Sequence, residues 1–435
     1  MALLFLLLSL GFSSIGGHAF VTSHFWGHFS PFFPVMSEIS PATPSGCQIT
    51  FVQSLNRHGS RNPTGTKIRE YDAIIKRIQN TVSHYSQDVE FIRAYDLTLG
   101  AGQLTPFGKK ESMDSGRLFY ERYQSLANHN EPFIRTVGEK RVIESISLWE
   151  RGFYRSLRGD DYDDKPHTNG RIQIIPKTEG FNNTLFHGLC AAFEKDYTTR
   201  GKEGQASWLV KFTQPITSRL NKKLPGADLT ATETVHLMDL CPMNTAVEGI
   251  ESEFCNLFTA EEWTNYEYYQ TLGKYYSWSY GNPLGPTQGV GFTNELIARL
   301  KQQPVVDHTS TNSILTNDLA KFPLDKKIYV DFTQAIYSAL GLYKEVQPLN
   351  KARRTLGVEA GGFQDSWLIP FAAQKMKCGE TEEEMVRVLV NDRVIPLSGC
   401  GADGLGRCTL RRFVESMEFA KSGGHWDKCF DESTG

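Results

Sequence analysis

Three short apolar runs in the chain predict buried β-strands. They cover residues 49–55, 328–332 and 386–390, and each contains β-branched or aromatic residues. An apolar run of this length is typical of a strand covered on both faces, as in a parallel sheet. The first run leads directly into Arg57, so the residues after it are expected at the carboxyl end of a strand.

Helical spacing of apolar residues marks stretches between the strands. Residues 72–82 and 105–126 show this spacing, and Thr105 followed by a proline has the form of an N-cap and a first-turn proline. Residues 294–300 predict a further helix, with Asn294 as its N-cap.

The mixture of strands and helices predicts the fold class. It favours an α/β fold with a mostly parallel sheet flanked by helices. The 435 residues are enough for two to three domains. Because strand patterns are weak in the middle of the chain, we expect a discontinuous α/β domain, residues 45–155 and 286–435, with a smaller, mainly helical domain inserted at 156–285.

The amino-terminal residues predict a secreted protein. Residues 1–12 are mostly apolar but too few to span a bilayer, which needs about 20 residues. Gly17, His18 and Ala19 then form the small-x-small pattern of a cleavage site, so residues 1–19 are predicted to be a signal peptide. We expect an extracellular product without a membrane segment.

The cysteine count agrees with an oxidising compartment. The chain has eight cysteines, and none forms the C-x-x-C spacing of zinc ribbons or thioredoxin-like sites. Four disulfides are predicted, although eight cysteines allow 105 pairings. The sequon at Asn182 predicts a glycosylated surface loop. The cysteines are Cys47, Cys190, Cys241, Cys255, Cys378, Cys400, Cys408 and Cys429.

Composition and charge exclude several function classes. Apolar residues make up 40% and charged residues 22%, which is a globular balance rather than that of a disordered chain. The formal charge of −3 lacks the basic excess of nucleic-acid-binding proteins.

A G-x-G-x-x-G match at residues 399–404 lies near the carboxyl terminus, not in an early βαβ unit, so it predicts a loop. The aspartates of residues 160–164 lack EF-hand spacing, and we expect neither a metal nor a cofactor.

The densest chemical pattern follows the first strand, at residues 57–63. It reads R-H-G-x-R-x-P, and its five fixed residue types would arise by chance in such a chain with a probability of about 10⁻⁴. Arg57 and Arg61 flank His58, and guanidinium groups bind phosphate oxygens through paired hydrogen bonds. Gly59 lets a ligand approach the imidazole, whose neutral form can attack phosphorus. The alternative is a basic surface loop with an incidental histidine.

This pattern is the signature of the histidine acid phosphatase family, which the chain resembles, and within it the fungal 3-phytase branch. The likeness runs from about residue 26 to 430 and includes WGHFSPFF, TLGAGQLTPFG, GNPLGPTQGVGF, ELIARL, VRVLVNDRVIPL and SGGHWDKCF. The resemblance implies an enzyme that hydrolyses phytate, myo-inositol hexakisphosphate, through a phosphohistidine intermediate.

The resemblance also implies roles for individual residues. His58 would be the nucleophile, and Arg57, Arg61 and Arg141 would bind the transferred phosphoryl group. Arg141 is identified by a segment resembling RVI-S; without the family it would be only an arginine before an amphipathic stretch. Arg93 is a further candidate for substrate binding, because family members tend to carry basic residues in that region.

The family likewise implies how the cysteines pair and where this chain departs from its relatives. His28 stands where a glutamine is frequent and Asp88 where a lysine is common, which leaves open the preference between phytate and simple phosphomonoesters. The implied disulfides are Cys47–Cys378, Cys190–Cys429, Cys241–Cys255 and Cys400–Cys408.

One motif of the family is missing from this chain. The family's general acid is the aspartate of a His-Asp dipeptide just after a strand ending in D-F-S/T, and it protonates the leaving oxygen. Here the strand ends at residues 331–333, and none of the eleven histidines precedes an acidic residue. Either a splice junction is misplaced in this sequence or the site is damaged. Asp331 is the nearest carboxylate, but its expected place is inside the strand.

The favoured prediction is a secreted, monomeric acid phosphomonoesterase acting on phytate, with doubtful activity because the general acid is missing. Its only predicted partner is a phosphorylated small molecule, with no nucleic acid and no membrane. The alternative is a non-catalytic secreted homologue that binds phosphorylated ligands through Arg57, Arg61 and Arg141. A phosphoglycerate-mutase-type transferase shares R-H-G, but those enzymes are cytosolic, which disagrees with the eight cysteines and the predicted signal.

Overall fold

The strand that leads to the R-H-G motif lies in the middle of the sheet. In a computed structural model, β1 (Cys47–Asn56) pairs in parallel with β4 (Ile328–Phe332) and antiparallel with β5 (Phe371–Cys378). The last six residues of β1 are all buried, which confirms the strand predicted from its apolar run. The structure describes residues 21–159, 172–332, 337–344, 347–354, 371–379 and 383–430.

The predicted α/β class is confirmed, with a mixed sheet whose core strands are parallel. Strands β3, β2, β4 and β1 are parallel, and β5 to β8 form antiparallel pairs. The antiparallel half follows from short connections: Asn391 and Asp392, with φ of 49° and 64°, form a two-residue hairpin turn between β6 and β7. Over the described residues the order is β3-β2-β4-β1-β5-β6-β7 with β8 beside β6, the other bounds being β2 (Phe133–Val137), β3 (Ile172–Ile175), β6 (Glu384–Val390), β7 (Arg393–Ile395) and β8 (Arg407–Thr409).

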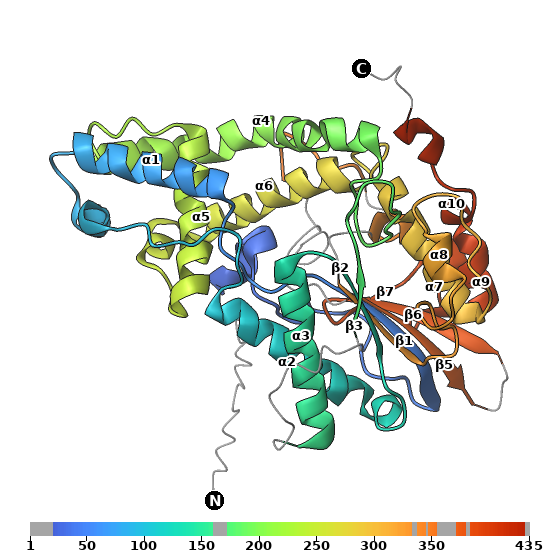
Figure 1. The fold of residues 1–435 in the computed structure, drawn as a ribbon. Coiled ribbons are helices and arrows are strands. Elements are labelled where there is room, and N and C mark those ends of the chain that lie inside the picture. Colours follow the sequence, from blue (N-terminus) through green and yellow to red (C-terminus); the bar gives the residue numbers. More distant parts are fainter. Residues whose placement is uncertain are drawn as a thin grey trace, which may run out of the picture.

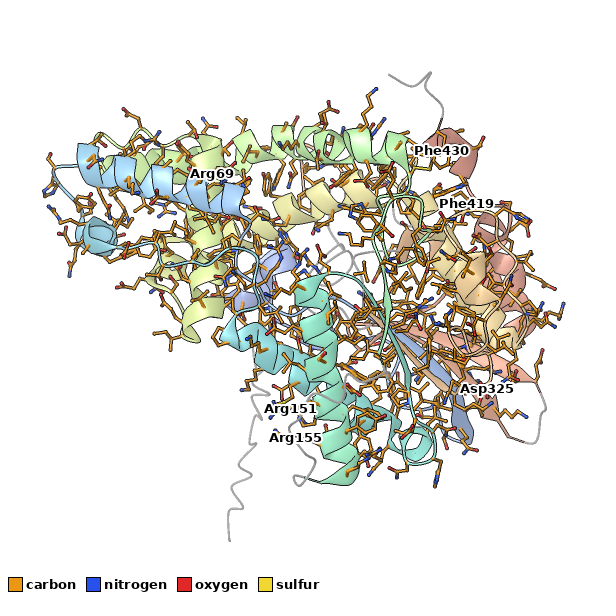
Figure 2. The ribbon with its side chains drawn as sticks, in the orientation of Figure 1. Arg69, Arg151, Arg155, Asp325, Phe419 and Phe430 are labelled. Atoms are coloured by element: carbon orange, nitrogen blue, oxygen red, sulfur yellow. A yellow bond between two sulfur atoms is a disulfide. The ribbon has the colours of Figure 1, made fainter. Side chains whose placement is uncertain are left out.

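Helices cover the sheet on both sides. Helices α2 and α3 lie on one side and α7 to α10 on the other (Figure 1), and side chains fill the space between these layers (Figure 2). The α2–α3 contact is close: a Cβ at Gly116 would lie 1.9 Å from the Trp149 carbonyl oxygen. The bounds are α1 (Gly65–Thr81), α2 (Pro106–Ala127), α3 (Lys140–Arg158), α4 (Ala191–Lys223), α5 (Ala231–Glu248), α6 (Ala260–Trp278), α7 (Val290–Lys301), α8 (Ser313–Thr316), α9 (Leu410–Ser416) and α10 (Glu418–Lys421).

A second hydrophobic cluster lies among helices α1, α4, α5 and α6, beside the sheet (Figure 1). Tyr71 and Ile78 of α1 are buried in this cluster, together with Trp26 and Trp263. Helix α1 belongs to the segment predicted as α/β, whereas β3 of the predicted helical segment joins the sheet. The two predicted segments are therefore interleaved in the packing, and the domain boundaries stay a prediction.

The two longer predicted helices are confirmed, and one predicted N-cap is wrong. The Thr105 hydroxyl accepts a hydrogen bond from the Gly108 amide at 3.0 Å, as an N-cap should. Helix α7 starts at Val290, so Asn294 lies inside it instead of capping it. The Asn294 side-chain amide donates to Asp307 at 2.7 Å and to the Ala420 carbonyl at 2.9 Å. Tertiary hydrogen bonds explain this asparagine, and the local pattern does not reveal them.

The structure pairs the cysteines as the family resemblance implies. No cysteine in the described part of the chain is free, and no helix there combines the length and apolar character needed to cross a bilayer. The predicted signal peptide, residues 1–19, lies outside the described residues. The four disulfides are Cys47–Cys378, Cys190–Cys429, Cys241–Cys255 and Cys400–Cys408.

Candidate active site

The imidazole of His58 is completely buried just beyond the end of β1. Its Nδ1 atom lies 2.9 Å from the carbonyl oxygen of Gly59. Because a carbonyl oxygen can only accept, Nδ1 carries the proton and Nε2 holds the lone pair. This tautomer leaves Nε2 as the nucleophilic atom.

The electrostatic environment keeps His58 uncharged. Burial lowers the pKa of His58 well below its ordinary value, and the positive charges of Arg57, Arg61 and Arg141 lower this pKa further. The hydrogen bond to Gly59 opposes these effects without overcoming them. These effects favour the neutral imidazole, which is the form that can attack phosphorus.

The loop that carries His58 is held between the first turns of α2 and α3. A Cβ at Gly59 would lie 2.1 Å from the Gly108 carbonyl oxygen, so only glycine allows this approach. The Gly59 amide donates to the Ser145 hydroxyl of α3 at 3.2 Å. The Ser60 carbonyl accepts from the Thr105 amide at 3.0 Å and from the Thr105 hydroxyl at 3.2 Å. These contacts fix the loop on rigid elements.

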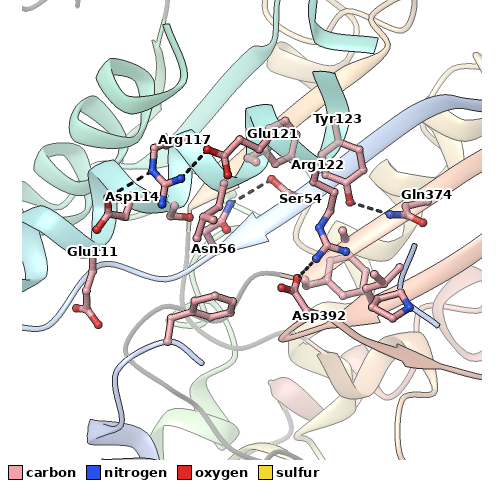
Figure 3. Close-up of a pocket in the computed structure, with 18 of the residues that line it drawn as sticks. Ser54, Asn56, Glu111, Asp114, Arg117, Glu121, Arg122, Tyr123, Gln374 and Asp392 are labelled. Atoms are coloured by element: carbon pink, nitrogen blue, oxygen red, sulfur yellow. Dashed lines mark hydrogen bonds and ion pairs between the residues drawn. The ribbon is translucent and has the colours of Figure 1, made fainter. Parts of the chain in front are cut away.

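A buried carboxyl group, Glu111 of α2, supports the same loop. Its Oε2 atom accepts hydrogen bonds from the Ser60 amide at 2.8 Å and from the Ser60 hydroxyl at 2.5 Å. Glu111 also lines a cavity of about 810 Å³ between α2 and the sheet (Figure 3). Burial raises the pKa of Glu111 to about 7, although the Ser60 hydrogen bonds oppose the shift. Sequence reasoning missed Glu111, because its contact with the loop depends on how α2 packs.

The arginines predicted to bind phosphate converge on His58. Arg57 and Arg61 come from the same loop, and Arg141 comes from the first turn of α3. Burial lowers the pKa of Arg61 to about 9, and the charges of Arg57 and Arg141 add to this effect. The three guanidinium groups repel one another, and a bound anion would reduce this repulsion.

Lys274 extends the positive region around this site, and an uncharged His28 lies beside it. His28 comes from the amino-terminal arm, which packs against α6, and Lys274 lies on α6. Burial lowers the pKa of His28 well below its ordinary value, and Lys274, Arg57 and Arg61 lower it further. The likeness to the family singled out His28, but no local pattern indicates Lys274, because only the packing of α6 brings it here.

Asp331 is engaged in a different buried cluster and does not serve as a general acid. Its carboxylate accepts from Arg135 at 2.7 Å, Arg299 at 3.1 Å and Gln53 at 2.9 Å. Burial opposes ionisation, but Arg135 and Arg299 outweigh it and hold the pKa of Asp331 below its ordinary value. An ionised aspartate of this kind carries no proton to donate. The junction after β4, residues 333–336, where the family's acid is expected, lies outside the described residues.

Two other predicted residues make contacts away from His58. Arg93 pairs with Glu90 at 2.7 Å and its guanidinium lies 4.5 Å from the Tyr85 ring centroid. No described contact joins Arg93 to His58 or to its arginines. The Asn182 side-chain amide, which would carry the glycan, donates to the carbonyl oxygens of Thr309 and Thr311, each at 3.1 Å. Its glycosylation stays a prediction.

Of the two further motif matches, only residues 399–404 lie in the described part of the chain. Residues 399–404 lie in a loop that the Cys400–Cys408 disulfide closes. The acidic residues 160–164 lie outside the described residues. Among the residues that are described, no group of three His, Cys, Asp or Glu side chains is arranged to hold a metal ion.

Comparisons with known proteins show which family this chain resembles. The model of the histidine phosphatase superfamily (branch 2) matches residues 48–391. The chain is 46% identical over 423 residues to Phytase A of Emericella nidulans, covering 94% of this chain and 90% of that one. It is 44% identical to Phytase A of Aspergillus fumigatus, covering 94% of this chain and 91% of that one.

Solved structures show the same fold at lower identity. The phytase from D. castellii superposes with a TM-score of 0.73 at 21% identity, covering 95% of this chain and 88% of that one. The multiple inositol polyphosphate phosphatase of Bifidobacterium longum, in complex with inositol hexasulfate, superposes with a TM-score of 0.62 at 14% identity, covering 91% of this chain and 97% of that one.

Proposed function

The chain belongs to branch 2 of the histidine phosphatase superfamily, and from this premise we propose that it is a phosphomonoesterase that acts on phytate. The observation that carries the proposal is the neutral Nε2 of His58 amid Arg57, Arg61 and Arg141. The names of its relatives, Phytase A, support phytate as the substrate. The positive region that includes Lys274 suits a polyanion.

The reaction proceeds in two displacements. The Nε2 lone pair of His58 forms a P–N bond while the bond from phosphorus to the inositol oxygen breaks. The three arginines hold the phosphoryl oxygens, whose negative charge they stabilise in the transition state. Water then attacks phosphorus, the P–N bond breaks, orthophosphate leaves, and Nε2 recovers its lone pair.

The first displacement also requires a proton for the leaving oxygen. The chain lacks the His-Asp dipeptide that would supply it, and Asp331 is held ionised by Arg135 and Arg299. A phenol-type leaving group needs little protonation, whereas an inositol oxygen needs it fully. We therefore expect p-nitrophenyl phosphate to be hydrolysed about 10²–10⁴-fold faster than phytate. Equal rates for the two substrates would mean that another residue supplies the proton.

Trapping the intermediate tests the proposal directly. The protein would be mixed with radiolabelled p-nitrophenyl phosphate, quenched under alkaline conditions, and digested to locate the label. The expected result is label on His58 and none on a His58→Ala variant. Ligand binding without label would instead support the alternative, a non-catalytic homologue that binds phosphorylated ligands, which the missing dipeptide favours.

Secretion and a monomeric state complete the proposal. The apolar segment followed by a small-x-small site supports a cleaved signal peptide, and the four disulfides support an oxidising compartment. Expression of the full chain in a secreting host, with the mature amino terminus and the solution mass determined, tests both statements.

A further inference from the structure

The carboxylate of Glu139 lies among the positive charges of the candidate site. It precedes α3 and is two residues away from Arg141. Its Oε2 atom lies 3.0 Å from Nη2 of Arg141, and its Oε1 atom lies 3.6 Å from Nζ of Lys177. About a quarter of the Glu139 and Arg141 side chains is exposed, so the pair is accessible to a ligand.

The side chain of Glu139 contacts these cations and does not cap the helix. The residue stands at the N-cap position of α3, yet its side chain makes no capping hydrogen bond. Its charge also reaches the phosphate-binding loop, because it opposes the lowering of the Arg61 pKa. The Nε atom of Arg141, by contrast, is buried and has no acceptor among the described residues. Within this guanidinium, Nη2 is thus bound to a carboxylate, while the adjacent Nε–H can still donate.

We propose that Glu139 is a specificity-determining residue that limits how much negative charge the site accepts beside the reacting phosphate. The inference rests on the function proposed above. A phosphate on His58 would accept hydrogen bonds from Arg57, Arg61 and Arg141. A neighbouring phosphate of a polyphosphorylated ring would need Arg141 and Lys177, which Glu139 already neutralises, and it would be repelled by the carboxylate.

The same contacts allow an opposite role, which makes the proposal testable. If Glu139 held Arg141 in the productive orientation, its removal would weaken every anion that binds the site. If Glu139 limits negative charge, its removal strengthens binding, and more so for ligands with more charges. Glu139→Gln keeps the size of the side chain and removes only the charge. Glu144→Gln is the matched control, because Glu144 lies on the same helix and pairs with Lys109 at 2.8 Å.

Calorimetric titration at pH 5 with two ligands that are not hydrolysed separates these roles. Inositol hexasulfate presents a sulfate at every ring position, and inorganic phosphate presents a single anion. Glu139→Gln should tighten hexasulfate binding about tenfold and phosphate binding less than threefold, whereas Glu144→Gln should change neither. Weaker binding, an equal change for both ligands, or no hexasulfate binding by either protein overturns the proposal. Because binding needs no turnover, failure of the proposed catalysis is detected separately, by the absence of label on His58.

Discussion

Two neighbouring groups of arginines in this protein have different partners. Beside β4, Arg135 and Arg299 bind Asp331, and Arg135 also binds Glu295 at 2.7 Å. Beyond the end of β1, Arg57, Arg61 and Arg141 act on a neutral histidine. The two places are one strand apart, since Leu55 of β1 is the register partner of Asp331.

The difference separates a structural cluster from a ligand site. Around Asp331 two positive charges meet two negative charges at hydrogen-bonding distance, and the cluster links β2, β4 and α7. Such a cluster needs no further ion, and removing one member leaves a buried charge without compensation. Around His58 the charges of Arg57, Arg61 and Arg141 act together on one neutral imidazole, an arrangement that favours an incoming phosphate.

The largest expected effect is the loss of the nucleophile. His58→Ala should lower the rate of p-nitrophenyl phosphate hydrolysis by about 10⁴-fold or more, since the proposed covalent intermediate forms on His58. The steady-state rate and the trapped label are the measurements. His84→Ala, at an exposed histidine, is the control and should keep full activity. A His58→Ala protein that retained substantial activity would show that the residues around His58 do not form the catalytic site.

Breaking the balanced cluster should destabilise the fold. Asp331→Asn leaves Arg135 and Arg299 without their shared carboxylate, at a cost of about 3–5 kcal/mol in the free energy of unfolding. Urea denaturation measures this cost. Asp318→Asn, which removes an exposed carboxylate paired with Lys321, should leave the unfolding midpoint unchanged. A midpoint shift as small as that of the control would contradict a structural role for Asp331.

Removing an arginine near His58 should lower activity and leave stability nearly unchanged. Arg141→Ala should lower kcat/KM by about 10²–10³-fold, because a transition-state donor is lost, while the unfolding midpoint changes little. Kinetics and urea denaturation on the same preparation show both effects, and Arg117→Ala, at an exposed arginine of α2, serves as the control. If Arg141→Ala destabilised the fold as strongly as Asp331→Asn, the two clusters would not differ in kind.

The smallest expected effect concerns the pH dependence of stability at Glu111. Burial raises its pKa to about 7 in the folded protein, above its ordinary value, so the folded state holds this proton more tightly than the unfolded state does. The resulting stabilisation is fully present below the unfolded pKa and is lost as the pH rises through about 7. Wild-type stability should therefore fall by about 2 kcal/mol more than that of Glu111→Gln between pH 5 and 8.

Glutamine at position 111 still accepts hydrogen bonds from Ser60 but does not titrate. Urea denaturation at several pH values, with Glu121→Gln as a control at an exposed position of the same helix, measures the difference. Parallel stability profiles for wild type and Glu111→Gln would show that this carboxyl is already ionised well below pH 7.

Local sequence patterns were sufficient to predict a residue's role where that role depends on its immediate neighbours in the chain. The apolar run of β1, the Thr105 N-cap and the R-H-G-x-R-x-P spacing are read within a few positions, and the structure places His58, Arg57 and Arg61 together accordingly. Arg141 required the family likeness as well. Patterns failed where distant segments meet: Asn294 was taken for an N-cap because its partners Asp307 and Ala420 are invisible in the local sequence.

The sequence by itself determined the family, the nucleophile and the absence of a His-Asp dipeptide, because each depends only on which residues follow one another. Only the tertiary structure decided which charged groups lie next to one another. Asp331 and Arg141 are both charged residues near buried segments, but Asp331 is surrounded by guanidinium groups from β2 and α7, whereas the charge of Arg141 acts on His58. Electrostatic energy depends on distances in space between groups far apart in the chain, and packing sets those distances.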